Sequence, residues 1–150
     1  MLYLHALGEL HMSGPAHETL PAQRKDLAIL LYLVRCRPAG ATRAELAALI
    51  WGERDEARAR HSLRQSLLRL RRRLAVPGEP TGVLEIDNGT VRVVPGRVRL
   101  DVALFETAVA EGRPADAISA WTGDFLADAE DVGGEEYRLW VEEERFMLRR

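Results

Sequence analysis

Arginine is concentrated in one segment of the chain, EARARHSLRQSLLRLRRRL, which runs from Glu56 to Leu74. Its leucines recur at intervals of four, three and four residues, and this spacing predicts a helix with one apolar side. The leucines of that side are Leu63, Leu67, Leu70 and Leu74. The opposite side presents guanidinium and amide groups, which are donors that phosphates and base edges accept. The residue types therefore predict a helix that binds nucleic acid.

The outward residues of this predicted helix fall into two sets, one expected to contact bases and one expected to contact the DNA backbone. Those expected to reach base edges are His61, Arg64, Gln65 and Leu68. Arg64 is the candidate for guanine and Gln65 for adenine, while Leu68 suits a thymine methyl group or the surface of a neighbouring helix. The expected contacts to the DNA backbone are Arg43, Arg60, Arg69, Arg72 and Arg73.

A hairpin is predicted after this helix, in the segment VLEIDNGTVRVV from Val83 to Val94. Apolar and polar residues alternate on both sides of Asn88-Gly89, a pair that favours a two-residue type I′ turn. A helix followed by a hairpin is the layout of a winged helix, in which the hairpin contacts the DNA backbone or the minor groove. The expected wing contacts are Asn88, Gly89, Thr90 and Arg92. The alternative is a hairpin that only closes the core, and Asp87 favours it because a carboxylate repels phosphate.

The elements before the arginine-rich helix can be predicted from local signals. The imperfect alternation of residues 2–10 predicts a short antiparallel start. Pro21 suits a first helical turn, and apolar spacing carries that helix to a stop before Pro38. Thr42 followed by Glu45 is a capping box, which predicts a second helix over residues 43–51. Asp55 is a suitable N-cap for the third helix, and a Pro-Gly pair at residues 77–78 ends the region.

The last third of the chain changes to a helical pattern. Asp101 is expected to cap a helix that runs to about Glu111, and Pro114 is expected to open another. Gly133-Gly134 breaks the chain before a last helix rich in aromatic residues. The inward residues of the first of these helices are predicted to be Leu104, Phe105 and Ala108.

Charge divides the chain in the same way. Residues 21–74 hold thirteen Lys or Arg and five Asp or Glu, a net charge of +8, whereas residues 101–150 hold five and thirteen, a net charge of −8. This asymmetry favours two units with different partners, the first suited to a polyanion. Two alternatives stay open: solvated helices that happen to differ in sign, and an acidic segment that docks on the basic face and masks it.

Other classes of protein lack support in the sequence. No glycine-rich phosphate loop, paired-cysteine metal spacing or nucleophile elbow is present, so we expect no enzyme, no metal and no cofactor. The four histidines are scattered along the sequence, and the acidic residues of 124–131 are expected to form a loop. The single cysteine, Cys36, suits a reducing compartment, and no apolar run approaches a membrane span. The expected location is the cytoplasm, away from any membrane.

Several segments in a fixed order resemble the antibiotic-regulatory-protein (SARP) type of bacterial activator. They are Leu7-Gly8-Glu9-Leu10, Arg24–Val34, ELAALIWG at Glu45–Gly52, ARHSLRQSLLRLRRRL at Ala59–Leu74, the hairpin, Asp101 with Phe105-Glu106, Gly123-Asp124-Phe125-Leu126 and Trp140–Arg145. The resemblance implies a mainly α fold with small antiparallel β elements. It implies an OmpR-type winged helix-turn-helix at residues 1–100 and the start of a tetratricopeptide-like bacterial transcriptional activator domain (BTAD) at 101–150.

This resemblance also implies a role. Members of that family bind promoter direct repeats side by side, which allows a homodimer on DNA, and help to recruit RNA polymerase. Residues 101–150 hold too few helices for a stable repeat array, so we expect this domain to be incomplete. The wing tip departs from the family because Asp87 and Asn88 replace more basic or Pro-Gly-rich residues. The rival interpretation is a protein-interaction module that uses the winged helix and the acidic helices without reading bases.

Overall fold

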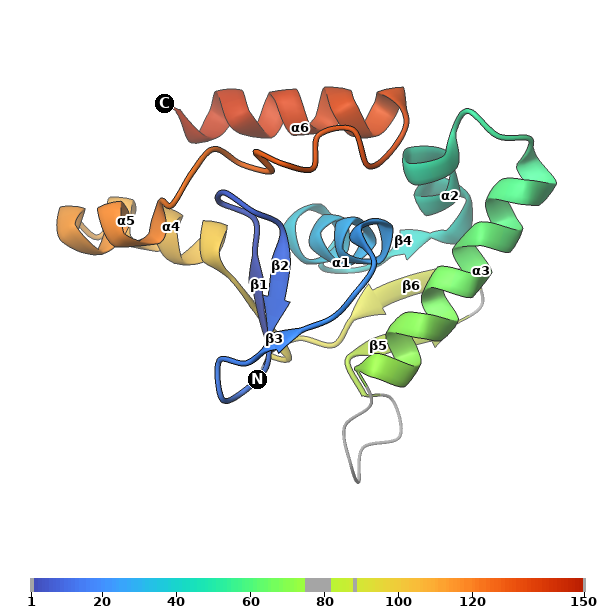
Figure 1. Ribbon diagram of the computed structural model, residues 1–150, viewed down its shortest axis with the longest axis horizontal. Coiled ribbons are helices and arrows are strands. Elements are labelled where there is room, and N and C mark those ends of the chain that lie inside the picture. The colour runs from blue at the N-terminus through green and yellow to red at the C-terminus, as the bar shows by residue number, and fades with distance from the viewer. Residues whose placement is uncertain (1, 75–81, 88, 150) are drawn as a thin grey trace.

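The computed structural model describes residues 2–74, 82–87 and 89–149, and Figure 1 shows a small sheet, a helical region with a hairpin, and a C-terminal helical region. The sheet has the strand order β3-β2-β1-β7. Its strands are β1 (Leu2–His5), β2 (His11–Ser13), β3 (Thr19–Leu20) and β7 (Val98–Leu100). The predicted antiparallel start is confirmed by β1, β2 and β3, whereas β7 joins β1 in parallel and pairs Val98 with Leu2.

Three helices follow the first strands: α1 (Arg24–Cys36), α2 (Arg43–Trp51) and α3 (Glu56–Arg73). The hydroxyl of Thr42 accepts a hydrogen bond from the N–H of Glu45 at 3.0 Å, which confirms the predicted cap of α2. In a full capping box the Glu45 carboxylate would also accept a hydrogen bond from the backbone N–H of Thr42. Here it accepts hydrogen bonds from Tyr32 and Arg37 instead. The Asp55 carboxylate caps α3 as predicted, and Pro77-Gly78 lies outside the described residues.

A second sheet holds the predicted hairpin and has the order β4-β6-β5. Its strands are β4 (Ala41–Thr42), β5 (Leu84–Asp87) and β6 (Thr90–Val93). Asp87 pairs with Thr90 across the turn, so the predicted two-residue connection is confirmed. Because β4 lies directly before α2, it ties the hairpin to the start of that helix.

The C-terminal helices are α4 (Asp101–Ala110), α5 (Pro114–Ala120) and α6 (Glu135–Leu148). Two predictions about α4 are wrong. Asp101 does not cap the helix, because its carboxylate accepts hydrogen bonds from the backbone N–H groups of Ala6 and Leu7, each at 2.9 Å. Leu104 is 49% exposed, because α5 packs on another side of α4.

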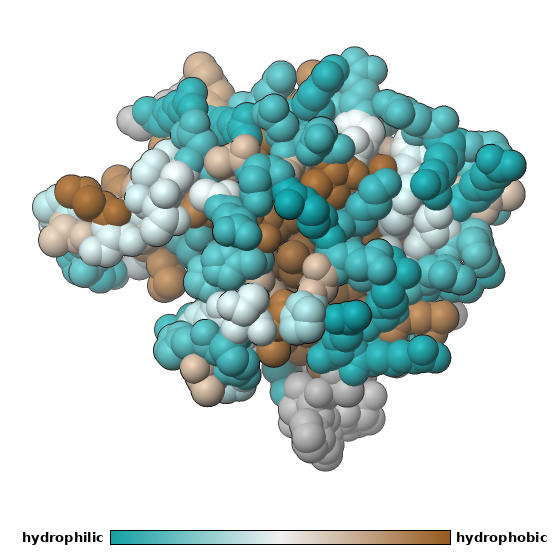
Figure 2. Space-filling model, in the orientation of Figure 1, coloured by the Kyte–Doolittle hydropathy of each residue, from teal (hydrophilic) through white to brown (hydrophobic). Residues whose placement is uncertain are grey.

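One hydrophobic core joins the three regions. Leu4 of β1, Leu46 of α2 and Leu67 of α3 are buried in the same cluster as Tyr137 and Val141 of α6. In Figure 1, α6 lies across the top of the view, above α1 and beside α2. In the same orientation, Figure 2 shows mainly hydrophilic residues over the region of α2 and α3 at the right, and a mixed surface over α4 and α5 at the left, where some hydrophobic residues are exposed. Of the C-terminal helices, α6 therefore packs on the helical core, α4 packs against β1 and β7, and α3 is left at one side.

Candidate nucleic-acid interface

The apolar side of α3 is buried as the leucine spacing predicts. Leu63, Leu67, Leu70 and Leu74 are at most 3% exposed. Ser66 is also buried on this side, where its hydroxyl accepts a hydrogen bond from Arg69. Since α2 and α1 pack against this stripe, the opposite side of α3 is turned to solvent.

The four residues predicted to reach bases all lie on that solvent side. His61, Arg64 and Gln65 are exposed, and Leu68 is 50% exposed although it is apolar. The Gln65 side-chain nitrogen and a His61 ring nitrogen lie 3.4 Å apart, one turn of helix from each other. The structure thus brings these side chains together on one face, which we call the α3 face: His61, Arg64, Gln65, Leu68, Arg71 and Arg72.

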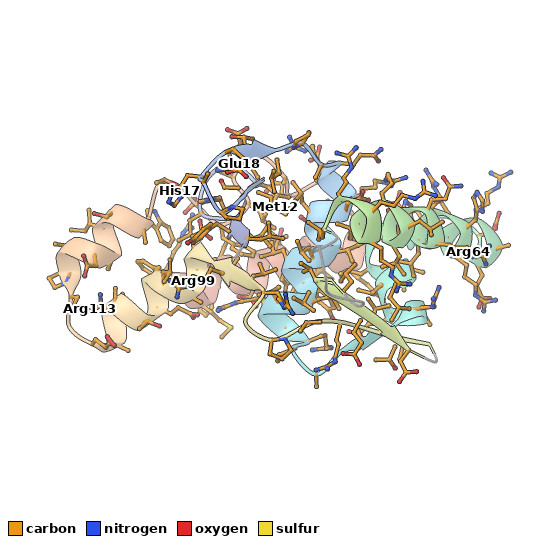
Figure 3. All side chains as sticks on the ribbon, turned by 90° about the horizontal axis from the view of Figure 1, so that it is seen from below. Met12, His17, Glu18, Arg64, Arg99 and Arg113 are labelled. Atoms are coloured by element: carbon orange, nitrogen blue, oxygen red, sulfur yellow. The ribbon has the colours of Figure 1, made fainter. Side chains whose placement is uncertain are left out.

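The arginines of α3 differ in what they contact. Within the part of the chain that the structure describes, the side chains of Arg64, Arg71 and Arg72 form no hydrogen bond or ion pair. Figure 3 shows nitrogen-bearing side chains, with Arg64 labelled, projecting from this helix. Arg71 was not among the residues predicted from the sequence. Its position seven residues after Arg64 places it on the same face and could have indicated it.

Arg69 is held inside the protein. Its guanidinium donates two hydrogen bonds to the carboxylate of Asp26 in α1, at 2.9 and 3.0 Å. Asp26 is only 1% exposed, and its hydrogen bonds to Arg69 raise the pKa of the guanidinium. A paired, buried carboxylate is left at high cost if its partner turns away. Arg69 therefore joins α3 to α1 through its ion pair with Asp26.

The other predicted backbone contacts are partly engaged. Arg60 forms an exposed ion pair with Glu56, one turn earlier on α3. Arg73 donates a 2.5 Å hydrogen bond to the carbonyl oxygen of Pro21. The half-buried side chain of Arg43 has no polar partner among the described residues, while its backbone N–H donates to Gly89.

Gly89 of the hairpin turn is exposed and lies beside the start of α2. Gly89 has a φ of +79°, and a Cβ at this residue would meet nothing within 4 Å, so only its backbone conformation favours glycine. Thr90 is exposed, whereas Arg92 lies along the strand and forms a 2.6 Å ion pair with Glu85. Asn88 lies outside the described residues.

The acidic C-terminal region leaves the α3 face open. His61, Arg64 and Arg72 are exposed in the presence of residues 101–149, because α6 packs on α2. Arg35 of α1 binds part of this acidic region instead, forming ion pairs with Glu106 of α4 and Glu144 of α6. The expected alternative of a masked basic face is therefore wrong for this conformation.

Three of the four histidines gather on the N-terminal sheet, although they are scattered in the sequence. The rings of His5 and His11 stack with their centroids 4.1 Å apart, and His17 stacks on Tyr3 at 5.3 Å. Burial lowers the pKa of His5, and His11 adds to this effect. No group of three or more His, Cys, Asp or Glu side chains in the described ranges is arranged to hold a metal ion. Within the same ranges, no helix has the length and apolar character needed to cross a membrane.

Comparison with known proteins supports the fold. No protein-family model matches the sequence, and no curated protein matches it either. The solved structure of Mycobacterium tuberculosis EmbR in complex with a low-affinity phosphopeptide superposes with a TM-score of 0.70 at 24% sequence identity. The match covers 99% of this chain and 43% of the EmbR chain, so this chain spans less than half of its length. The likeness shows a shared fold, in which small sheets, a helix-turn-helix and a hairpin form a winged helix followed by further helices.

Proposed function

We propose that this chain is a DNA-binding transcriptional regulator that reads the major groove with α3. The observation that carries the proposal is the α3 face, where Arg64, Arg71 and Arg72 are exposed and unpaired among the described residues. Arginines without acidic partners attract a polyanion with their full charge. In an arginine that is already paired, the neighbouring carboxylate offsets much of that attraction. A helix anchored by leucines and placed after a helix-turn supplies the rigid support that base reading requires.

The positions on the α3 face divide the proposed work. Arg64 and Gln65 contact base edges, with His61 and Leu68 beside them. Arg72, together with Arg71, contacts phosphates. Arg60 and Arg73 add phosphate contacts by exchanging weak internal partners for DNA, and Arg43 adds one from the start of α2. Arg69 is a positioning residue, since its guanidinium is already held by Asp26.

The wing contributes through its turn. Gly89 and Thr90 are exposed at the end of the hairpin, where a DNA backbone has access to them, and Asn88 joins them in the sequence. Arg92 is set back along β6 and is paired with Glu85, so its contact is the weaker part of the wing. The nearby Asp87 carboxylate limits the wing to a supporting role.

The resemblance to SARP-type activators extends this proposal. It supports side-by-side binding of two copies to promoter direct repeats, recruitment of RNA polymerase, and a cytoplasmic location. Residues 1–100 would then be the DNA-binding unit, and residues 101–150 the beginning of a BTAD-like domain. The packing of α4 against α5, which follows it after a short connection, is compatible with the first unit of a tetratricopeptide-like array.

The proposal can be tested by fluorescence anisotropy with a labelled random duplex at several salt concentrations. We expect wild-type binding at roughly 1–100 µM that weakens steeply with salt. The double variant Arg64→Ala/Arg72→Ala should lose this binding. The matched control Arg113→Ala/Arg138→Ala removes two exposed arginines outside the α3 face and should retain it.

A protein-interaction module is the second candidate function. The observation in its favour is the exposure of large apolar side chains on the C-terminal helices, with Ile118 at 75% and Phe146 at 67%. Exposed apolar side chains that gather on a surface mark protein-binding sites. A folded wild-type protein that gives a flat duplex titration would refute the DNA proposal and leave this candidate in first place.

A further inference from the structure

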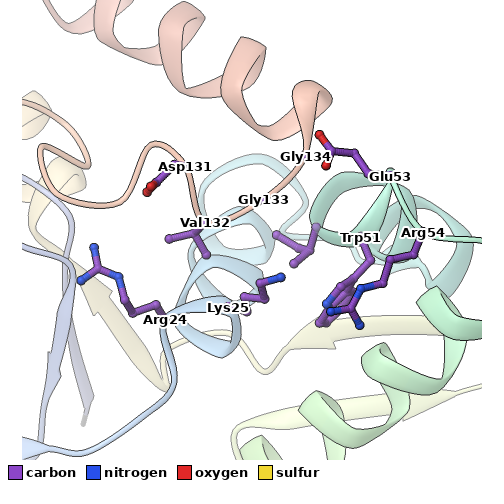
Figure 4. A pocket seen from close by; sticks show the side chains of 10 residues that line it. Arg24, Lys25, Trp51, Glu53, Arg54, Asp131, Val132, Gly133 and Gly134 are labelled. Atoms are coloured by element: carbon purple, nitrogen blue, oxygen red, sulfur yellow. The ribbon is translucent and has the colours of Figure 1, made fainter.

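A hollow of about 440 Å³ lies where α1, the turn between α2 and α3, and the loop before α6 meet (Figure 4). This volume is within the range of sites for small molecules. Its charged and aromatic lining residues are Arg24, Lys25, Trp51, Glu53, Arg54 and Asp131. Figure 4 shows the Lys25 side chain between Arg24 on one side and Trp51 with Arg54 on the other. We call this hollow the Lys25 pocket.

Lys25 is the only lysine in the sequence, and it forms no salt bridge with a carboxylate in the described part of the chain, although Glu53 lies nearby. Its ammonium group lies 5.6 Å from the centroid of the Trp51 ring. Burial lowers the pKa of Lys25, the nearby Arg54 lowers it further, and Glu53 opposes them. An anion beside the ammonium would relieve the repulsion between the two cations and replace lost hydration.

The first turn of α1 adds positive potential close to the pocket, because two residues of that turn line it. Arg24 and Lys25 are the first residues of α1, a helix of 13 residues, and its N-cap residue Gln23 provides no side-chain cap. The N–H groups of a first helical turn carry partial positive charge and attract anions. Arg54 also forms no salt bridge among the described residues. Its guanidinium donates a hydrogen bond to the hydroxyl of Ser62, which is uncharged. Three sources of positive potential therefore converge on one hollow.

We propose that the Lys25 pocket binds a small molecule that carries a phosphate or carboxylate group. Lys25, Arg54 and the N-terminus of α1 hold the anionic group, and Trp51 contacts the remainder of the molecule. Glu53 and Asp131, which also line the pocket, disfavour ligands with negative charge at both ends. The chemistry is therefore that of a compact anion with a neutral or polar body.

Such a ligand would touch two parts of the protein at once. The loop before α6 is fixed to α2, because the N–H of Gly134 donates to the carbonyl oxygen of Leu49 at 3.2 Å. A Cβ at Gly133 would lie 3.0 Å from the carbonyl oxygen of Leu49 in α2 and 2.6 Å from the Tyr137 side chain, so a larger residue would not fit without a shift. The pocket thus adjoins both the helix-turn-helix and the C-terminal segment, which is where an effector would influence their packing.

Selective ¹⁵N-lysine labelling gives a direct test, because one lysine gives one backbone amide signal, located in the first turn of α1. The labelled protein is titrated with sodium phosphate, and in parallel with sodium acetate, at constant ionic strength set with sodium chloride. We expect a saturable shift of the Lys25 signal with a dissociation constant in roughly the millimolar range. Sodium chloride alone should leave the signal in place.

Two variants locate the binding and one controls for charge. Arg54→Gln should weaken phosphate binding about tenfold. Lys25→Gln, followed in uniformly labelled protein through the amide signals of Gly133 and Gly134, should weaken it by a similar factor. Arg113→Gln removes one exposed cation at the distant end of the molecule and should change nothing (Figure 3).

A shift that does not saturate, or equal binding by wild type, Arg54→Gln and Lys25→Gln, would overturn the proposal. A Lys25 signal that responds to duplex DNA but not to phosphate would also overturn it, and would assign Lys25 to the DNA interface. The inference is independent of the DNA proposal, because phosphate binding in a protein that ignores duplex DNA would support the pocket and refute only the proposed function.

Discussion

Two groups of arginines in this protein have opposite surroundings. At the junction of α1 with the C-terminal helices, Arg35 is paired with Glu106 and Glu144, and Arg145 binds Glu130 and two backbone carbonyl groups. On the α3 face, Arg64 and Arg72 are exposed and have no partners in the described residues. The same side chain serves to join elements in one region and is available to a ligand in the other. What separates the two uses is the placement of carboxylates, which the tertiary fold decides.

The sharpest test of this contrast is stability. Arg35→Met would leave Glu144, which is 8% exposed, without its cation, so we expect the free energy of unfolding to fall by about 3 kcal/mol. Arg72→Met should change it by less than about 0.5 kcal/mol, because an exposed, unpaired arginine contributes little. Urea denaturation measures both variants. Equal losses of stability in the two variants would mean that the paired arginines and the exposed arginines contribute alike to folding.

For DNA affinity we expect the opposite: substitutions on the α3 face should have the larger effect. Arg64→Ala is expected to cost roughly 1–3 kcal/mol on a preferred duplex and to relax the sequence preference, because a base contact is lost. Arg72→Ala should weaken all duplexes alike and reduce the salt dependence by about one phosphate contact. Anisotropy titrations on selected and random duplexes distinguish the two. If Arg64→Ala left affinity and preference unchanged, its assignment to a base edge would be wrong.

A substitution at Asp26 should convert Arg69 from a paired arginine into an unpaired one. Asp26→Asn removes the charge that holds its guanidinium, so we expect a loss of about 1–2 kcal/mol in the free energy of unfolding. The released cation would add about one phosphate contact and make duplex binding more dependent on salt. Urea denaturation and a salt series of anisotropy titrations measure the two effects. An unchanged salt dependence would show that Arg69 stays in place without Asp26.

The smallest expected effect is a pH dependence at Cys36, which lies where α1 meets α6. Burial raises the pKa of the Cys36 thiol from its ordinary value of 9.0 to about 11, and Trp140 donates a hydrogen bond to its sulfur. The unfolded chain therefore loses this proton first, so the thiol's contribution to stability is complete below about pH 9 and is lost as the pH rises toward 11. Comparing urea denaturation of wild type and Cys36→Ser across this range isolates it. Parallel curves would exclude a contribution from Cys36.

Local signals were sufficient to predict the framework of the proposed interface. The leucine spacing placed the buried side of α3, and Thr42 and Asp55 marked the starts of two helices, because each depends on residues within a few positions. The hairpin was predicted for the same reason, since its turn pair and alternating strands are adjacent in sequence. Whether the exposed side chains contact DNA stays a prediction.

The partners of individual side chains could not be predicted. Arg69 and Asp26 meet only because α3 packs against α1, and nothing near either residue in the sequence indicates this pair. Asp101 followed the pattern of a helix cap, yet its carboxylate binds the chain near Leu7. Leu104 fitted the apolar side of α4, but the side that is covered depends on where α5 and the sheet lie. These are tertiary contacts, and periodicity alone contains no information about them.

The absence of a spacer between β7 and α4 has a mechanical consequence. β7 ends at Leu100 in the sheet with β1, α4 begins at the next residue, and Asp101 fastens this junction to the backbone of Ala6 and Leu7. The last helices therefore cannot swivel freely about the winged helix, and a regulator built this way would present them at a fixed angle around the DNA axis. If the proposed regulatory function holds, transcription should depend on rotational phase: inserting about five base pairs between operator and promoter should silence it, and inserting about ten should restore it.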